Sequence, residues 1–167
     1  SQSLDADSHD SGSELSVVVA NVKMSNDGYA RTLEVIREAD PDIVMLLEVD
    51  NAWIDAVGPP LRKTYESAVE KPLENTYGIA LYSRLPLFET DIRDLLVTDV
   101  PSIRTGVELS SGDRVRLYAI HPEPPLPIQD TEGRDGEIAM IGMEAADDAL
   151  PAIVAGDLND VAWSSTT

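Results

Sequence analysis

The chain has 167 residues, of which 43% are hydrophobic, a length and composition that suit one domain with an apolar core. Its 31 acidic and 12 basic residues give a formal net charge of −19, which argues against a broad electrostatic grip on nucleic acids, because such binding depends on clustered Lys and Arg. Cysteine is absent from the sequence, so disulfides and thiolate metal sites are excluded and any metal must use oxygen or imidazole ligands.

Residues 1–14 differ in composition from the rest of the chain. They hold Ser, Asp and Gly but only one large apolar residue, Leu4, too little to offset the entropy of ordering. We predict a disordered acidic leader over 1–14 and one folded domain over 15–167. No apolar run approaches the roughly 20 residues of a membrane-spanning helix, so the chain as given should be soluble. The leader would also suit a tether from a membrane segment outside this sequence, which would make the domain extracytoplasmic.

Apolar runs separated by turn residues predict the elements in chain order. In the first half we expect a strand, a helix, a second strand and a second helix, at 15–22, 29–39, 42–49 and 51–62. Gly58-Pro59-Pro60 should interrupt the second helix, because proline removes a helical hydrogen bond and its ring clashes with the preceding turn.

From residue 67 onward the pattern changes to short segments with turn residues between them, which indicates hairpins. Further strands are expected at 67–69, 77–83, 87–91, 103–109, 114–121 and 152–155. The proline-rich stretch 121–127 should be a stiff extended loop. A helix at 134–149 should follow, with Ile138, Ile141 and Ala145 as its buried stripe.

Two passages of the chain share one architecture. In the first, a strand ending at Asn21 and a strand ending at Glu48 flank a helix; in the second, a strand ending at His121 and a strand leading to Asp157 and Asn159 do the same. Ligands of α/β sheets bind at the carboxyl ends of strands. Because hairpins lie between the two passages, we predict an α/β fold made of a two-sheet sandwich of mixed strands flanked by helices.

The polar residues at these strand ends suggest metal-assisted phosphate chemistry. Glu48 with the amide of Asn21 suits magnesium, which prefers a few carboxylate or carbonyl oxygens and completes its shell with water and phosphate. Asp157 and Asn159, two residues apart on an extended chain, share a face. Asp157 could then align and deprotonate a water, Asn159 could hold that carboxylate or a phosphate oxygen, and His121 could donate to developing negative charge.

Each of these residues taken singly also has a structural explanation. Glu48 could be a solvated strand end, Asp157 a helix or turn cap, Asn21 a turn former and His121 a polar residue ahead of proline. Four coincident strand ends favour a shared site, because polar groups beside apolar runs need partners.

Four stretches, in this order, resemble the endonuclease/exonuclease/phosphatase superfamily, whose founding fold is that of deoxyribonuclease I. They are Val19-Ala20-Asn21-Val22, Leu46-Leu47-Glu48-Val49, the segment from Tyr77-Gly78 to Leu85-Pro86, and Ala155-Gly156-Asp157-Leu158-Asn159-Asp160. The resemblance implies a deoxyribonuclease I-like sandwich. It also implies that Asn21 and Glu48 contact a divalent metal, usually Mg²⁺, with Mn²⁺ or Ca²⁺ as alternatives.

The resemblance assigns roles to further residues. Asp157 and Asn159 would orient the attacking water and the phosphate, and His121 would contact the phosphate or assist proton transfer. Arg104 lies where many members place a phosphate-binding arginine, with a surface charge on a strand as the alternative. Tyr77 would wall the cleft, with an ordinary aromatic at a sheet edge as the alternative.

The sequence departs from the superfamily after residue 160. Members normally continue with a strand pair that carries a catalytic Asp and a terminal Asp-His, whereas this sequence ends at Thr167. We therefore expect the domain to be truncated at its C-terminus, either as a fragment or as a natural short form. A fragment is favoured, because loss of those strands would expose a sheet edge.

Two functions remain open at this stage. The first is a metal-dependent phosphoesterase that hydrolyses a phosphodiester or a phosphomonoester with activated water; the second is a catalytically incomplete binding or scaffold module of the same fold. The phosphoester could belong to a small molecule, a lipid or a nucleic acid, and the acidic composition favours the first two. The oligomeric state is not specified by the sequence.

Overall fold

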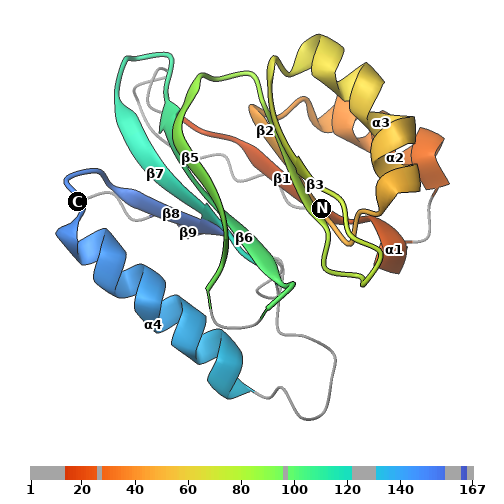
Figure 1. Cartoon of the computed structure of the whole chain (residues 1–167). Coiled ribbons are helices and arrows are strands. Elements are labelled where there is room, and N and C mark those ends of the chain that lie inside the picture. Colours follow the sequence, from red (N-terminus) through yellow and green to blue (C-terminus); the bar gives the residue numbers. More distant parts are fainter. Residues whose placement is uncertain (1–13, 26–27, 96–97, 122–130, 157–162, 165–167) are drawn as a thin grey trace.

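A computed structural model of the chain describes residues 14–25, 28–95, 98–121, 131–156 and 163–164. Two sheets form its centre (Figure 1). The first sheet has four strands in the order β1-β2-β4-β3. These are β1 Val17–Asn21, β2 Ile43–Leu47, β3 Ser67–Lys71 and β4 Ile79–Ser83. β1 runs parallel to β2, and β4 is antiparallel to both of its neighbours, so the sheet is mixed as predicted.

The second sheet has five strands in the order β5-β6-β7-β8-β9. These are β5 Leu87–Asp94, β6 Pro101–Glu108, β7 Arg114–Ala119, β8 Ala152–Ala155 and β9 Trp163–Ser164. Only the pair β7–β8 is parallel among the described strands of this sheet. The second sheet is therefore also mixed, with a parallel pair beside antiparallel neighbours.

Helices cover the outer faces of the two sheets. They are α1 Val22–Ser25, α2 Gly28–Ala39, α3 Asn51–Thr64 and α4 Thr131–Asp147. Figure 1 shows α2 and α3 along the first sheet and α4 on the far side, along the second. The predicted sandwich flanked by helices is thus confirmed. None of the described helices is long and apolar enough to cross a bilayer.

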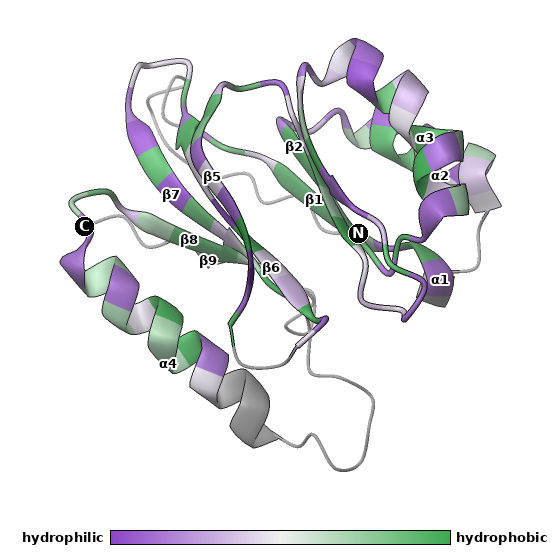
Figure 2. Ribbon diagram, viewed as in Figure 1, coloured by the Kyte–Doolittle hydropathy of each residue, from purple (hydrophilic) through white to green (hydrophobic). Residues whose placement is uncertain are grey.

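β2 shows why the first sheet lies in the interior. Its five residues are all buried and alternate between two cores: Ile43, Met45 and Leu47 face the second sheet, whereas Val44 and Leu46 face α2 and α3. A strand with apolar groups on both faces is stable only between two layers. The hydrophobic residues of β1 and β2 are green in Figure 2. β2 therefore places its carboxyl end at a junction between layers.

Two sequence-based expectations about the helices were wrong. α3 runs unbroken through Gly58-Pro59-Pro60. Its buried face, formed by Trp53, Val57 and Leu61, packs on the first sheet on both sides of the prolines, and both proline rings lie at the solvent side. Packing of both halves thus outweighs the local penalty of proline.

The second error concerns α4, where Ile138 is 39% exposed rather than part of the buried stripe. Ile141 is buried as expected. The inward face of α4 also carries Glu144, which binds Arg93 of the second sheet, so this face is partly polar and an apolar stripe alone does not identify it.

Boundaries also differ at the end of β1. The strand stops at Asn21 and Val22 begins the one-turn helix α1, whereas the sequence suggested strand to residue 22. All but the last residue of the leader expected at 1–14 and most of the expected proline-rich loop lie outside the described residues, as do Asp157 and Asn159.

Candidate functional site

The carboxyl ends of β1 and β2 lie side by side. The strands are parallel with Asn21 opposite Leu47, so Glu48 follows directly beside the asparagine. The amide Nδ2 of Asn21 donates a hydrogen bond of 2.9 Å to Oε1 of Glu48. The two residues that the sequence predicted as metal ligands therefore form one pair, with a carboxylate and a carboxamide oriented toward each other.

The backbone of Glu48 adopts a left-handed conformation with φ of +63°. This region is unfavourable for a residue with a side chain and persists only where neighbouring structure enforces it. Here the backbone N–H groups of Glu48 and Val49 both donate to the carbonyl of Gly78, at 2.9 Å and 3.3 Å. The bend after β2 is thus held by the segment that enters β4, and it sets the direction of the Glu48 side chain.

Gly78 is required at this contact. A Cβ atom on residue 78 would lie 1.8 Å from the carbonyl oxygen of Val49, far closer than two non-bonded atoms can approach. Sequence reasoning placed Gly78 in a motif but gave it no role. The signal was available, since a glycine next to an apolar strand indicates a close approach of two backbones.

His121 reaches the same segment from the second sheet. It follows β7, is 4% exposed, and its Nε2 lies 2.7 Å from the carbonyl oxygen of Tyr77. Because a carbonyl only accepts, Nε2 carries the hydrogen in this contact. The rings of Tyr77 and His121 also meet edge to face, with centroids 5.7 Å apart. Tyr77 therefore orients the imidazole through both its backbone and its ring.

The surroundings of His121 favour the neutral imidazole. Burial lowers the pKa of His121 below its usual value of 6.5, while the carbonyls of Tyr77 and Gly78 and the charge of Glu48 act in the opposite direction. The carbonyl of Gly78 accepts from the backbone of Glu48, and the carbonyl of Tyr77 accepts from the imidazole, so residues 77–78 connect the strand end that carries Glu48 to His121. Asn21, Glu48, Tyr77 and His121 are therefore linked through one segment, and their roles in a site stay predictions.

β8 ends at this site as well. It runs parallel to β7 with Ala155 opposite Ala119, and the N–H of Ile120 donates to the carbonyl of Ala155 at 2.9 Å. A Cβ on Gly156 would lie 2.6 Å from the carbonyl oxygen of Ile120, so a glycine is needed for this approach. The chain thus leaves β8 directly beside His121, one residue before Asp157.

The structure does not bring Arg104 into this group. Residue 104 lies on the face of β6 opposite Ile103, which packs between the sheets. Its guanidinium forms ion pairs with Glu144 and Asp148 of the α4 region, both at 3.6 Å, and with Asp91 at 3.9 Å. The side chain of Arg104 is 23% exposed and joins the second sheet to α4, and its role in phosphate binding stays a prediction.

The donor set fits a hard cation with few protein ligands. Within the part of the chain that the structure describes, no three His, Cys, Asp or Glu side chains converge as a metal site. Glu48 and Asn21 supply one carboxylate and one carboxamide oxygen. Mg²⁺ is commonly held in this sparse manner, by one or two carboxylates plus waters and a substrate phosphate.

Solved structures share this architecture. The match to TDP2 from D. rerio, complexed with single strand DNA product, has a TM-score of 0.69 and 20% identity and covers 88% of this chain and 61% of that one. The match to the human Nocturnin catalytic domain with bound sulfate has a TM-score of 0.60 and 23% identity. It covers 80% of this chain and 56% of that one. The match to an endonuclease/exonuclease/phosphatase family protein from Bacteroides thetaiotaomicron has a TM-score of 0.64 and 14% identity. It covers 87% of this chain and 63% of that one.

At these identities the likeness shows the fold alone, and the chain spans less than two thirds of the length of each of these structures. No curated protein sequence matches the chain significantly. A family model, Endonuclease/Exonuclease/phosphatase family, matches residues 18–167, which include β1, β2, β4, β7 and β8. The chain therefore belongs to the endonuclease/exonuclease/phosphatase family, with a deoxyribonuclease I-like fold.

Proposed function

We propose that the protein is a divalent-metal-dependent phosphoesterase that hydrolyses a phosphodiester or a phosphomonoester with an activated water. The observation that carries this proposal is that residues 77–78 contact both the Asn21–Glu48 strand end and the imidazole of His121. Members of this family are typically metal-dependent nucleases or phosphatases, which supports hydrolysis as the reaction class.

Glu48 and Asn21 would hold the cation, with Mg²⁺ favoured and Mn²⁺ or Ca²⁺ as alternatives. When bound, such a cation would neutralise charge that develops on the phosphoryl group. The carbonyl of Tyr77 would keep the imidazole of His121 in position to contact a phosphate oxygen or pass on a proton. Tyr77 would also wall the cleft. Asp157 would align and deprotonate the water, and Asn159 would hold that carboxylate or a phosphate oxygen.

A small or lipid phosphoester is the favoured substrate. The net charge of −19 repels a long polyanion and leaves nucleic-acid binding to local contacts. The D. rerio TDP2 structure contains a single strand DNA product, so a nucleic-acid phosphodiester is the second choice. Comparing a dinucleotide with an aryl phosphodiester as substrates separates these classes.

Hydrolysis of bis(p-nitrophenyl) phosphate and of p-nitrophenyl phosphate, with Mg²⁺, Mn²⁺ or Ca²⁺ and with EDTA, tests the proposal. Glu48→Gln and Asp157→Asn should each lower kcat/KM by roughly 10²–10⁴-fold, since each removes a group that acts in the reaction. Glu34→Gln, an exposed substitution on α2, is the matched control and should leave turnover unchanged. Turnover that survives both EDTA and Glu48→Gln would refute the proposal.

The second candidate is a catalytically incomplete binding or scaffold module of the same fold. It is supported by the sparse donor set, since in the described residues no three His, Cys, Asp or Glu side chains converge as a metal site. Calorimetric titration with Mg²⁺ or Mn²⁺ distinguishes the two. Metal binding that Glu48→Gln abolishes, together with absent turnover, would favour the module.

A further inference from the structure

A pocket of about 140 Å³ lies between α2 and α3, away from the site described above. Its wall includes Asp40, which precedes β2, and Arg84, which follows β4. The first residue of β2 pairs with the last residue of β4, Ser83, so the pocket is at the end of the first sheet opposite Glu48. It therefore belongs to neither the Asn21–Glu48 pair nor His121.

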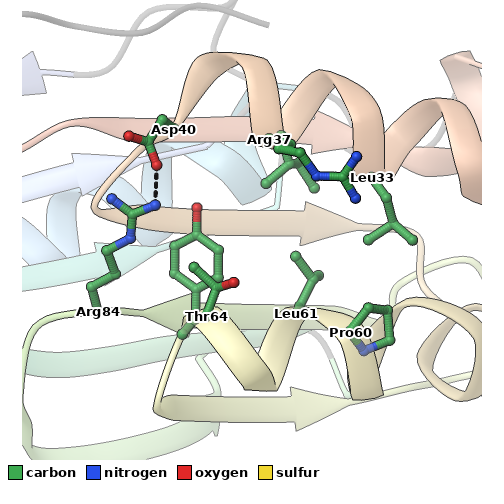
Figure 3. A pocket seen from close by; sticks show the side chains of 9 residues that line it. Leu33, Arg37, Asp40, Pro60, Leu61, Thr64 and Arg84 are labelled. Atoms are coloured by element: carbon green, nitrogen blue, oxygen red, sulfur yellow. Dashed lines mark hydrogen bonds and ion pairs between the residues drawn. The ribbon is translucent and has the colours of Figure 1, made fainter.

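The pocket combines an apolar interior with two cations. Figure 3 shows Leu33 and Leu61 from facing helices, with the guanidinium groups of Arg37 and Arg84 on two sides. Ile36, Pro60 and Tyr65 also line it, and Ile36 and Tyr65 are 2% exposed. The base is therefore formed by buried side chains, and the charges lie around it.

The charges around the pocket do not balance. Arg84 is neutralised by an ion pair with Asp40 and stacks on the ring of Tyr65, 5.1 Å from its centroid. Arg37 forms no ion pair with any residue that the structure describes. The lining thus carries two positive groups and one negative group in a protein whose net charge is −19. Arg37 in the last turn of α2 also complements the helix dipole, but that role needs no cavity beside it.

We propose that this pocket binds a small aromatic monocarboxylate, with the ring against Leu33 and Leu61 and the carboxylate on Arg37. A guanidinium donates two parallel hydrogen bonds to a carboxylate, which suits a planar anion better than a point charge. A cavity of about 150 Å³ holds a benzene ring, so the volume here matches a ligand the size of benzoate. The proposal goes beyond the phosphoester site and does not rest on it.

Titration of the ¹⁵N-labelled protein with benzoate, followed by amide chemical shifts, tests the proposal. Saturable shifts are expected at Arg37, Leu61 and Tyr65. Benzamide, which keeps the ring but has no charge, should bind roughly 10-fold more weakly, because hydrogen bonds to charged groups are the stronger ones. Adding Mg²⁺ should leave the benzoate affinity unchanged, which separates this site from the proposed metal site.

Variants decide which group anchors the ligand. Arg37→Gln should weaken benzoate binding by roughly 10-fold, whereas Arg31→Gln, an exposed arginine of the same helix outside the pocket, should not change it. Thr64→Phe places a ring at the mouth and should also abolish the saturable shifts. Non-saturable shifts, equal affinity for benzamide, or an unaffected Arg37→Gln would each overturn the proposal. Preferential binding of benzylammonium would overturn it too, since Asp40 would then be the anchor.

Discussion

Glu48 and His121 belong to different sheets, and the backbone of residues 77–78 is what joins them. The carbonyl of Gly78 accepts from the bend that contains Glu48, and the carbonyl of Tyr77 accepts from His121. Both acceptors are in one short segment, so a displacement of that segment moves the carboxylate and the imidazole together. The geometry of the proposed site therefore depends on main-chain contacts as much as on the reactive side chains.

The pKa of His121 should report on this arrangement. We expect its NMR titration midpoint to lie below 6.5, because burial disfavours the imidazolium. Glu48→Gln should lower the midpoint further, since it removes a negative charge that favours protonation. A midpoint at or above 6.5, or a rise in Glu48→Gln, would contradict the geometry. Glu34→Gln is the control with no expected shift, and His9, the other histidine of the sequence, serves as a reference resonance.

The same pKa direction links His121 to stability. The folded state binds a proton less readily than the unfolded state, so the free energy of unfolding should fall as the pH drops below 6.5. Above that value both states hold a neutral imidazole and the contribution vanishes.

The placement of individual candidate residues was predictable from the sequence where a strand ended in a polar group. Asn21, Glu48 and His121 follow apolar runs, and parallel pairing brings such ends together. The position of Arg104 was not predictable in this way. The alternation of side chains along β6 shows which residues share a face of the strand. It does not show which face packs on the other sheet and which packs on a helix.

At the scale of elements, α4 is attached to the second sheet largely by ion pairs. Arg93 and Arg116, together with Arg104, face Glu144 and Asp148. Arg116 is the most buried of these, with its side chain 5% exposed, and its Nε donates to Asp148 at 2.8 Å. Among the residues of α4 whose burial is described, 136–147, Ile141 alone is fully buried. This explains why hydrophobic periodicity alone gave the wrong orientation for Ile138.

Asp148→Asn should therefore destabilise the protein by about 1–3 kcal/mol at neutral pH, because it removes the more buried of the two carboxylates that pair with Arg116 and leaves only the exposed Glu89. Chemical denaturation measures the change. Glu34→Gln, which breaks an exposed pair on α2, should cost at most about 1 kcal/mol.

The effect of Asp148→Asn should also depend on pH. The N–H of Leu150 is the main cause that lowers the pKa of Asp148 below 3.8, and Arg116 adds to it. The stabilisation is thus present above that value and is lost as the pH falls through the folded-state pKa. The parent and the variant should converge in acid; a constant difference would show that the variant acts through packing instead.

In α3, too, local sequence rules and tertiary packing predict different structures. Local rules correctly flagged Pro59-Pro60 as unfavourable, but they could not weigh the buried contacts of Trp53 and Leu61 on either side. The N-terminus of α3 follows local rules well: Asp50 caps the helix by accepting from the N–H of Trp53 at 2.9 Å. Local chemistry thus predicted how the helix begins, and tertiary packing decided where it ends.

For the whole molecule, the alternation of strand and helix passages predicted the layered arrangement, because two βαβ-like passages separated by hairpins leave few ways to bury every apolar face. The sequence did not show how the folded protein remains stable with a net charge of −19. Repulsion among surface carboxylates opposes the compact state, while the ion pairs under α4 favour it, and salt screens both.

We expect the repulsion to dominate, so that the free energy of unfolding rises between about 0.01 M and about 1 M NaCl, over which the Debye length falls from roughly 30 Å to 3 Å. The ion pairs at Arg116 are buried and should be screened little. Urea denaturation at each salt concentration measures the trend. A non-ionic osmolyte at equal osmolality is the control, and a fall in stability with salt would mean that the ion pairs outweigh the repulsion.

The left-handed backbone at Glu48 also bears on engineering. Glycine and asparagine adopt that conformation more readily than glutamate does. Directed evolution that rewards heat resistance alone would consequently enrich Gly or Asn at position 48 and discard the carboxylate. A library built on this scaffold should therefore hold residue 48 constant. A higher melting temperature without an activity screen would not identify useful variants.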